Sequence, residues 1–276
     1  MKKKTPASAS DPMLIDSHCH LQDRKYERDM EQVIARALDT GVTAMVTIGY
    51  DMPSSRRAIE IADSHENVFA TIGVHPHDAK ELRPRDLEDL AKLASSPKVV
   101  GIGEIGLDFY RNLSPQDDQY RAFRKQLAVA EATMLPVVIH SRDADQEVFD
   151  VLAEYAEDAR SALPQERPIG VMHCYAGDLP LAMRYIKIGF VLSIAGPVTY
   201  SKSHTTRAVA GAIPLASMTV ETDAPYLPPQ RIRGERNEPV NVKDVAEYVA
   251  ELRGMPYTEV AEATAQTAIR LFGLPL

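Results

Sequence analysis

Histidines and carboxylates stand at or just past the C-terminal ends of several short apolar segments of this chain. His18 and His20 share the first of these segments, and because side chains on a strand alternate between faces, both imidazoles are expected to point the same way. Each of the other residues of this kind closes a segment of its own. The six candidate metal ligands are His18, His20, Glu104, His140, His173 and Asp223.

This ligand set mixes imidazoles with carboxylates, which favours a transition metal over an all-oxygen calcium site. One catalytic zinc takes about three or four protein groups, whereas two ions that share a bridging carboxylate would use the whole set and leave room for water. We therefore expect two divalent metal ions, Zn, Mg or Mn, bridged by Glu104. Ions of this kind lower the pKa of water and neutralise charge on a substrate oxygen, so the pattern predicts a metal-dependent hydrolase.

Asp223 has two interpretations in such a site. A carboxylate beside a metal can accept the proton of the attacking water, and on this basis we expect Asp223 and Glu104 to be the catalytic residues. In the alternative interpretation, Asp223 is a ligand with no role in proton transfer.

The short apolar segments alternate with longer segments of helical character. Parallel strands joined by helices build either an open doubly wound sheet or a closed barrel, and eight strands in 276 residues favour a (β/α)8 TIM barrel. Active sites of such barrels lie at the C-terminal ends of the strands, where the candidate ligands fall. The predicted strands span 13–20, 42–49, 68–75, 98–106, 136–140, 168–173, 190–195 and 217–223.

No low-complexity linker separates these elements. We therefore expect a single (β/α)8 barrel catalytic domain over residues 13–276, preceded by a disordered tail over 1–12 that contains lysine, serine and alanine. The predicted helices span 27–39, 54–65, 115–133, 143–158, 178–188, 201–212, 239–252 and 257–271.

Composition restricts the class of protein further. No apolar stretch approaches the roughly 20 residues that cross a bilayer, so we expect a cytoplasmic protein without membrane contact or an obligate protein partner. The net charge of −8 argues against coating of long DNA duplexes, and any contact with nucleic acid should be local. Cys19 and Cys174 lack the spacing of a thiolate zinc site and are expected to be core thiols.

The segment Gly101–Gly106 has the Gly-x-Gly-x-x-Gly spacing of a dinucleotide-binding loop. That loop opens a helix and presents backbone N–H groups to a pyrophosphate, whereas this segment continues into Leu107-Asp108-Phe109 and carries the carboxylate of Glu104, which would repel phosphate. We therefore expect these glycines to permit close approach of backbone and ions.

Two residues close to strand ends are candidates for binding a substrate phosphate. His75 ends the third predicted strand, and its alternative role is that of a core or supporting histidine. Arg142 follows the fifth strand and suits bidentate phosphate recognition, although it could instead pair with Asp143 or Asp145.

The loop 230–239, after the eighth strand, concentrates positive charge and adds Arg231 and Arg233 to the expected substrate-binding residues. Its alternative interpretation is a solvated loop with internal ion pairs. Tyr226, just before it, could stack on a base, but packing under the loop is the favoured interpretation.

Five motifs contain the candidate ligands and their neighbours, and a sixth contains His75. They are Ile15-Asp16-Ser17-His18-Cys19-His20-Leu21, Gly73-Val74-His75-Pro76-His77, Gly103-Glu104-Ile105-Gly106-Leu107-Asp108, Ile139-His140-Ser141-Arg142, His173-Cys174-Tyr175-Ala176-Gly177 and Glu221-Thr222-Asp223-Ala224-Pro225-Tyr226.

In these motifs and their order, the chain resembles the TatD-type deoxyribonucleases of the amidohydrolase superfamily from about residue 13 to its C-terminus. The resemblance implies a (β/α)8 barrel and hydrolysis of DNA ends or short single-stranded DNA, best known as 3′-to-5′ exonuclease activity. The implied ligands are His18, His20, Glu104 and Asp223 for one ion and Glu104, His140 and His173 for the other.

Two segments depart from the family pattern, namely the tail before Met13 and Leu21–Tyr26, but neither removes a ligand. Two other functions stay open at this point. A binuclear site can also hydrolyse carboxylic esters or amides, which predicts activity on small uncharged substrates. A binding protein without catalysis would hold metal and show no turnover.

Overall fold

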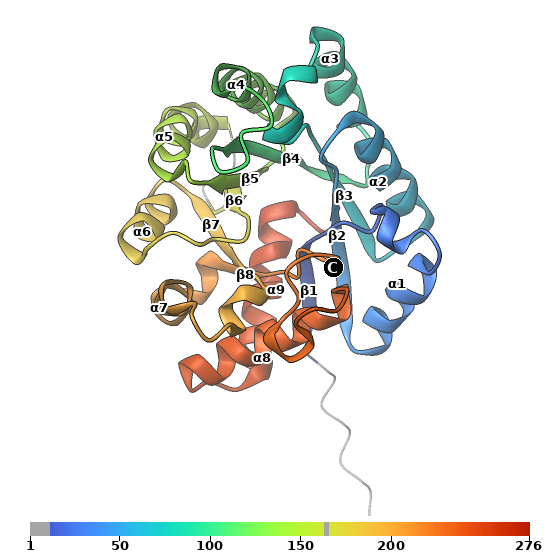
Figure 1. Ribbon diagram of the computed structural model, residues 1–276, viewed down its shortest axis with the longest axis vertical. Coiled ribbons are helices and arrows are strands. Elements are labelled where there is room, and N and C mark those ends of the chain that lie inside the picture. The colour runs from blue at the N-terminus through green and yellow to red at the C-terminus, as the bar shows by residue number, and fades with distance from the viewer. Residues whose placement is uncertain (1–11, 163–165) are drawn as a thin grey trace, which may run out of the picture.

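The computed structural model describes residues 12–162 and 166–276, without the side chains of 160–162. Eight parallel strands pair in sequence order around a ring, as Figure 1 shows in a view down the barrel. The predicted (β/α)8 TIM barrel is confirmed, whereas the predicted tail over 1–12 lies outside the described residues except for Pro12. The strands are β1 Leu14–Cys19, β2 Val42–Ile48, β3 Val68–Ile72, β4 Val99–Asp108, β5 Val137–Arg142, β6 Gly170–Met172, β7 Phe190–Ile194 and β8 Met218–Val220.

The ring closes through backbone contacts between the end of β1 and the segment that follows β8. The amide of His20 donates to the carbonyl of Ala224 at 2.7 Å, and the amide of Asp223 donates to the carbonyl of His18 at 2.9 Å. A parallel bridge joins Cys19 to Ala224. β8 ends at Val220, so these contacts are made by the segment that follows it. They fix His18, His20 and Asp223 next to one another.

Helices surround the ring and cover its outer face, except for α9, which lies behind the ring in this view (Figure 1). Most lie within a few residues of their predicted bounds, but the helix α3 was not predicted. Its segment carries mostly charged residues around Leu87 and Leu90, so the apolar period is short. The helices are α1 Met30–Asp39, α2 Met52–Ser64, α3 Pro84–Leu93, α4 Gln116–Thr133, α5 Asp145–Ala162, α6 Leu179–Lys187, α7 His204–Ala212, α8 Val242–Arg253 and α9 Tyr257–Phe272.

An apolar layer fills the barrel at the N-terminal ends of its strands. Six strands each contribute their second residue to this layer, and α9 packs against it with Ala265, Ala268, Leu271 and Phe272. This end is therefore built for packing, and the polar residues are left to the opposite end. The second residues in the layer are Ile15, Phe69, Val100, Val138, Val171 and Val191.

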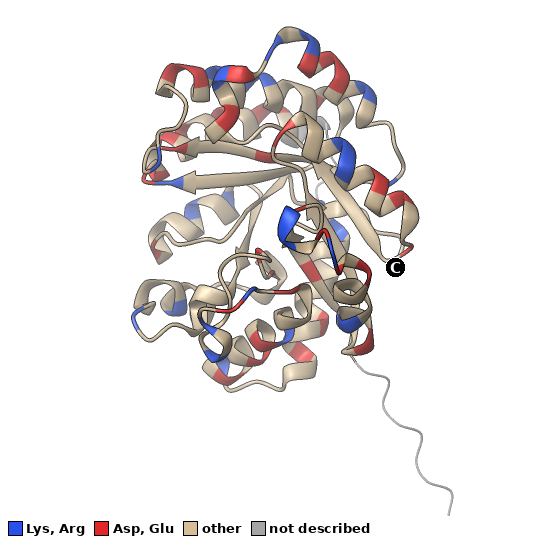
Figure 2. Ribbon diagram, turned by 45° about the vertical axis from the view of Figure 1, so that its right-hand side comes forward, with Lys and Arg blue, Asp and Glu red and all other residues tan. Residues whose placement is uncertain are grey.

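Charged residues of both signs lie on the surrounding helices and loops, whereas most of each strand carries none (Figure 2). In the described part of the chain, no helix is long and apolar enough to cross a membrane. The expected cytoplasmic location remains a prediction.

Candidate metal centre

The predicted ligands from β1 and from the segment after β8 meet at the C-terminal end of the barrel. Nε2 of His18 lies 3.3 Å from Nε2 of His20. Oδ1 of Asp223 lies 3.4 Å from Nε2 of His20 and 3.6 Å from Nε2 of His18. All three side chains are buried. Two imidazole nitrogens and a carboxylate oxygen therefore converge as the alternation of β1 side chains predicts.

Glu104 on β4 lies between this group and two further histidines. Its Oε2 is 3.6 Å from Nε2 of His18. Its Oε1 is 2.8 Å from Nδ1 of His140 and 3.7 Å from Nε2 of His173. The carboxylate is 4% exposed and therefore has little contact with water. Its two oxygens face different histidines, which is the position that a bridging ligand would take.

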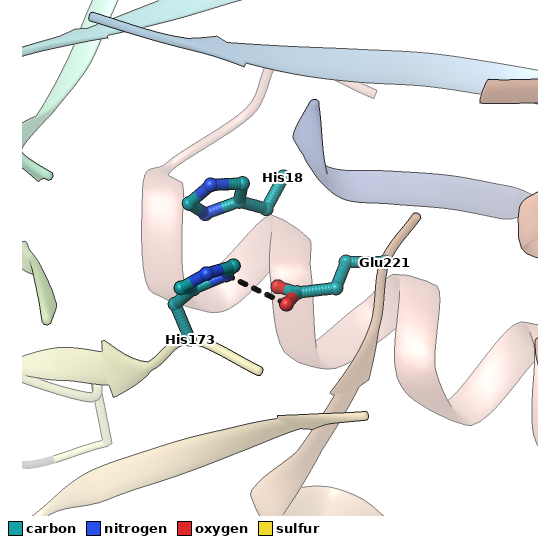
Figure 3. A group of neighbouring side chains, drawn as sticks. All are labelled: His18, His173 and Glu221. Atoms are coloured by element: carbon teal, nitrogen blue, oxygen red, sulfur yellow. Dashed lines mark ion pairs between the residues drawn. The ribbon is translucent and has the colours of Figure 1, made fainter. Parts of the chain in front are cut away.

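His173 is supported by a carboxylate to which the sequence reasoning gave no role. Oε1 of Glu221 lies 2.7 Å from Nδ1 of His173. The two side chains form an ion pair when His173 is protonated. Glu221 also accepts the backbone N–H of Cys174 at 2.8 Å. Figure 3 shows the His173 ring face to face with His18, at 3.7 Å between ring centroids, and Glu221 reaching His173 from one side.

The electrostatics of this cluster favour a cation. Burial disfavours a charged imidazole, yet the carboxylates of Glu221 and Glu104 raise the pKa of His173 to about 10. Burial likewise opposes charge on Glu104, yet His173 and His75 hold the pKa of Glu104 well below its usual range. The potential that favours a proton on His173 would also attract a divalent ion.

The donor set fits a transition metal. Within residues 12–162 and 166–276, three groups of side chains offer ligand atoms within 4.8 Å of one another: His18, His173 and Glu221; His18, His20 and Glu104; and His75, Glu104 and His140. Nδ1 of His18 is buried without a hydrogen-bond partner among the described residues. Neutral imidazoles and ionised carboxylates are the forms that bind such ions. The residues can therefore hold metal, as predicted, while the role of each ligand remains a prediction.

Replacing Glu221 with Gln should lower metal affinity about 10- to 100-fold, because the carboxylate that orients a ligating histidine would lose its charge. Binding of Mn²⁺ followed by calorimetry measures this effect. Glu235→Gln, at an exposed loop position, is the matched control and should bind as the unaltered protein does. Equal affinity in Glu221→Gln and the control would remove the supporting role from Glu221.

The glycines around Glu104 let β4 approach β5 closely. Gly103 and Gly106 have φ values of +151° and +145°, which L side chains rarely adopt. A Cβ atom at Gly106 would lie 2.0 Å from the carbonyl oxygen of His140. The segment is part of a strand throughout, so the rejection of a dinucleotide-binding loop is confirmed. The glycines set the spacing between Glu104 and His140.

Gly106→Ala should destabilise the fold by about 1–3 kcal/mol, because the added methyl group meets backbone that cannot move aside cheaply. Urea unfolding of the metal-free protein measures the change. The control is Gly211→Ala in α7, where the nearest atom to the new Cβ is 3.9 Å away and a gain in helix propensity is expected. Equal stability of the two variants would show that β4 and β5 tolerate a wider separation.

A cavity of about 980 Å³ opens over these residues. Its wall includes Asp108, which the sequence reasoning passed over although it lies in the quoted β4 motif. Oδ2 of Asp108 lies 2.8 Å from Nε2 of His77 and 3.2 Å from Nε2 of His140. Its own burial is outweighed by these histidines and the backbone N–H of Arg111, which hold the pKa of Asp108 well below its usual range. Asp108 thus contacts Nε2 of His140, while Nδ1 of the same ring faces Glu104.

Two of the predicted substrate-binding residues line this cavity. His75 is buried, its Nδ1 accepts the backbone N–H of His77, and its Nε2 faces Oε1 of Glu104 at 3.5 Å. Burial and the neighbouring His140 lower the pKa of His75 to about 4, so its ring is neutral at neutral pH. Arg142 is exposed, and within the described residues it forms no ion pair with Asp143 or Asp145, the alternative that the sequence left open.

The other two predicted substrate-binding residues do not line the cavity. Nη2 of Arg231 lies 2.8 Å from Oδ2 of Asp244, and the guanidinium of Arg233 lies 4.5 Å above the ring of Tyr200. Both partners lie outside the loop, and the ion pair within it, as the alternative expected, joins Nη2 of Arg236 to Oε1 of Glu238 at 2.8 Å. A role for Arg231 and Arg233 in substrate binding remains a prediction without support from their position.

Two further expectations were wrong. Cys19 is buried as expected, but Cys174 is only partly buried and lines the cavity, because the chain turns at Cys174 with a φ of +44°. Tyr226 was expected to pack under the loop, yet 43% of this residue is exposed and it also lines the cavity.

Comparison with known proteins agrees with this geometry. The chain matches the family model of TatD related DNases over residues 15–273. YabD of Bacillus subtilis strain 168, named as an uncharacterized metal-dependent hydrolase, is 40% identical over 260 residues, covering 94% of this chain and 99% of the relative. A protein of Erwinia tasmaniensis named 3′-5′ ssDNA/RNA exonuclease TatD is 34% identical, covering 95% and 100%.

A solved structure gives the same result. The crystal structure of YJJV, a TatD homologue of Escherichia coli K12, superposes with a TM-score of 0.87 at 30% identity, covering 95% of this chain and 98% of that one. The fold, the cluster and these relatives define a metal-dependent hydrolase of the barrel type. The chain belongs to the TatD family.

Proposed function

We propose that this protein is an exonuclease that uses two divalent metal ions to remove nucleotides from the 3′ ends of single-stranded DNA. The observation that carries the proposal is the position of Glu104, whose two oxygens face histidines from opposite sides of one cavity. The name of the Erwinia relative, a 3′-5′ ssDNA/RNA exonuclease, supports this substrate and direction.

Each ion would have its own ligands, with Glu104 shared. His18, His20 and Asp223 would hold one ion, and His140 and His173 would hold the other. When bound, ions of this kind lower the pKa of water and neutralise the charge on the nonbridging oxygens of a phosphodiester. Zn²⁺, Mg²⁺ and Mn²⁺ are the candidate ions.

Asp223 would accept the proton of the attacking water. Its burial favours the neutral form, but the contact with His20 and the charges of His173 and His18 hold the pKa of Asp223 below its usual range. Asp223 is therefore ionised at neutral pH and can act as a base. His75 carries its proton on Nε2, because Nδ1 accepts a hydrogen bond, and that N–H can donate to a substrate oxygen.

The test uses metal-stripped protein and single-stranded DNA labelled at either end, with Mg²⁺, Mn²⁺, Zn²⁺ or Co²⁺ added separately. We expect a 3′ label to be released at once as mononucleotide and a 5′ label to shorten stepwise. Chelation should stop both reactions, and Glu104→Ala should show neither. Intact DNA together with hydrolysis of small carboxylic esters would show instead that the site acts on carbonyl substrates.

A further inference from the structure

Two exposed tyrosines lie at the cavity or next to a residue that lines it. Among the large apolar residues that are exposed in the described chain, the two aromatic ones are Tyr110 at 58% and Tyr226 at 43%. Tyr226 lines the cavity, and Tyr110 contacts Arg142, which also lines it. Exposed aromatic rings that lie beside cations are groups on which the bases of a single strand can stack.

Tyr226 is held firmly next to the candidate metal ligands. Its hydroxyl donates to Oδ2 of the buried Asp23 at 2.7 Å. Its ring centroid lies 6.0 Å from that of His20. Nζ of the exposed Lys25 lies 4.4 Å from the centre of the ring. The ring is thus fixed at its polar end, and a flexible side chain covers one of its faces.

Tyr110 makes a similar pair across the mouth. It follows β4, and the guanidinium of Arg142 at the end of β5 lies 4.2 Å from the centre of its ring. In a ring of eight strands in sequence order, β4 and β5 lie opposite β8 and β1. The pair Tyr110–Arg142 therefore stands across the cavity from the pair Tyr226–Lys25.

We propose that these two pairs are stacking platforms that hold the nucleobases on either side of the phosphodiester to be cleaved. Each tyrosine would stack on one base, and each cation would bind the neighbouring backbone phosphate, as in proteins that bind single strands without regard to sequence. Bases can stack in this way only when unpaired, so the platforms select single-stranded ends. This inference rests on the proposed nuclease function and adds the source of its strand preference.

The experiment compares an ordinary single strand with strands that carry an abasic residue at the 3′-terminal or penultimate position. Tyr226→Ala and Tyr110→Ala should each lower kcat/KM on the ordinary strand roughly 5- to 150-fold. On the strand that lacks the base on which a given tyrosine stacks, replacing that tyrosine with alanine should cause little further loss of kcat/KM. Tyr226→Phe keeps the ring and should retain most activity. Tyr257→Ala is the control, since Lys243 lies over that ring but neither residue of this pair lines the cavity.

A binding measurement separates this inference from the nuclease function. A single strand with 3′-terminal phosphorothioate linkages resists hydrolysis, and 2-aminopurine near its end loses fluorescence when it stacks. Quenching by the metal-loaded protein that disappears in the two alanine variants supports the platforms, even if no strand is ever hydrolysed. Equal losses of kcat/KM on ordinary and abasic strands, or quenching unaffected by either variant, would overturn the inference.

Discussion

Glu104→Gln should reduce hydrolysis of single-stranded DNA by about a thousandfold or more, the scale on which loss of a buried electrostatic group acts in a catalytic site. The substitution keeps the size of the side chain and removes its charge. His18, His140 and His173 all face the carboxylate of Glu104, so a neutral amide would leave these imidazoles without the anion that they share. We expect the metal content of the purified variant to fall with the rate.

The rate of Glu104→Gln is measured on end-labelled DNA at saturating Mn²⁺, with metal content determined by elemental analysis. Glu259→Gln in the first turn of α9 is the matched control and should behave as the unaltered protein does. Retention of full turnover in Glu104→Gln would show that the shared carboxylate is not needed.

Asp223→Asn should lower kcat by about 10²- to 10⁴-fold, the usual contribution of a general base, while much of the metal remains bound. The amide oxygen can still ligate, but it cannot take a proton at neutral pH. The contact with Nε2 of His20 at 3.4 Å is replaced by one with a neutral oxygen, so some loss of metal is also expected.

Turnover divided by metal occupancy separates the two roles of Asp223. A rate per occupied site that stays low at saturating Mn²⁺ supports proton transfer. If the rate falls only in proportion to occupancy, Asp223 is a ligand and no general-base role remains.

The sequence predicted that the candidate ligands would come together, because each lies at or near the end of an apolar segment. Strand ends of a parallel barrel meet at one edge, so residues as distant as His18 and Asp223 could be brought together by topology alone. His18 and His20 also point the same way, with their Nε2 atoms 3.3 Å apart, although β1 ends at Cys19 and His20 follows it directly. These features depend on the spacing of residues along a strand and on the order of the strands, and both can be read from a single sequence.

Residues that support the ligands were harder to predict. Glu221 and Asp108 lie in quoted motifs, but their contacts with His173 and His140 join residues that are far apart in the sequence. Contacts between side chains of different strands do not recur at a regular spacing along the chain, so the sequence pattern does not reveal them. A carboxylate two residues before a ligand, as Glu221 is before Asp223, is the signal that could have been used.

Loops and surface residues account for most of the remaining errors. The charge of the loop 230–239 predicted a phosphate site, but Arg231 pairs with Asp244 in α8. The exposure of Tyr226 depends on how the chain leaves β8, where Asp223 adopts a φ of +55°. The missed helix α3 has few apolar residues because most of it faces solvent. Such features are decided by packing between segments rather than by the local pattern.

Anomalous diffraction from crystals soaked in Mn²⁺ or Zn²⁺ tests most directly whether the histidines and carboxylates bind metal ions. We expect two peaks in the cavity, one contacted by His18, His20 and Asp223 and the other by His140 and His173. Glu104 should contact both peaks. The absence of any peak near these residues in crystals soaked to saturation would contradict the metal-dependent hydrolase described above.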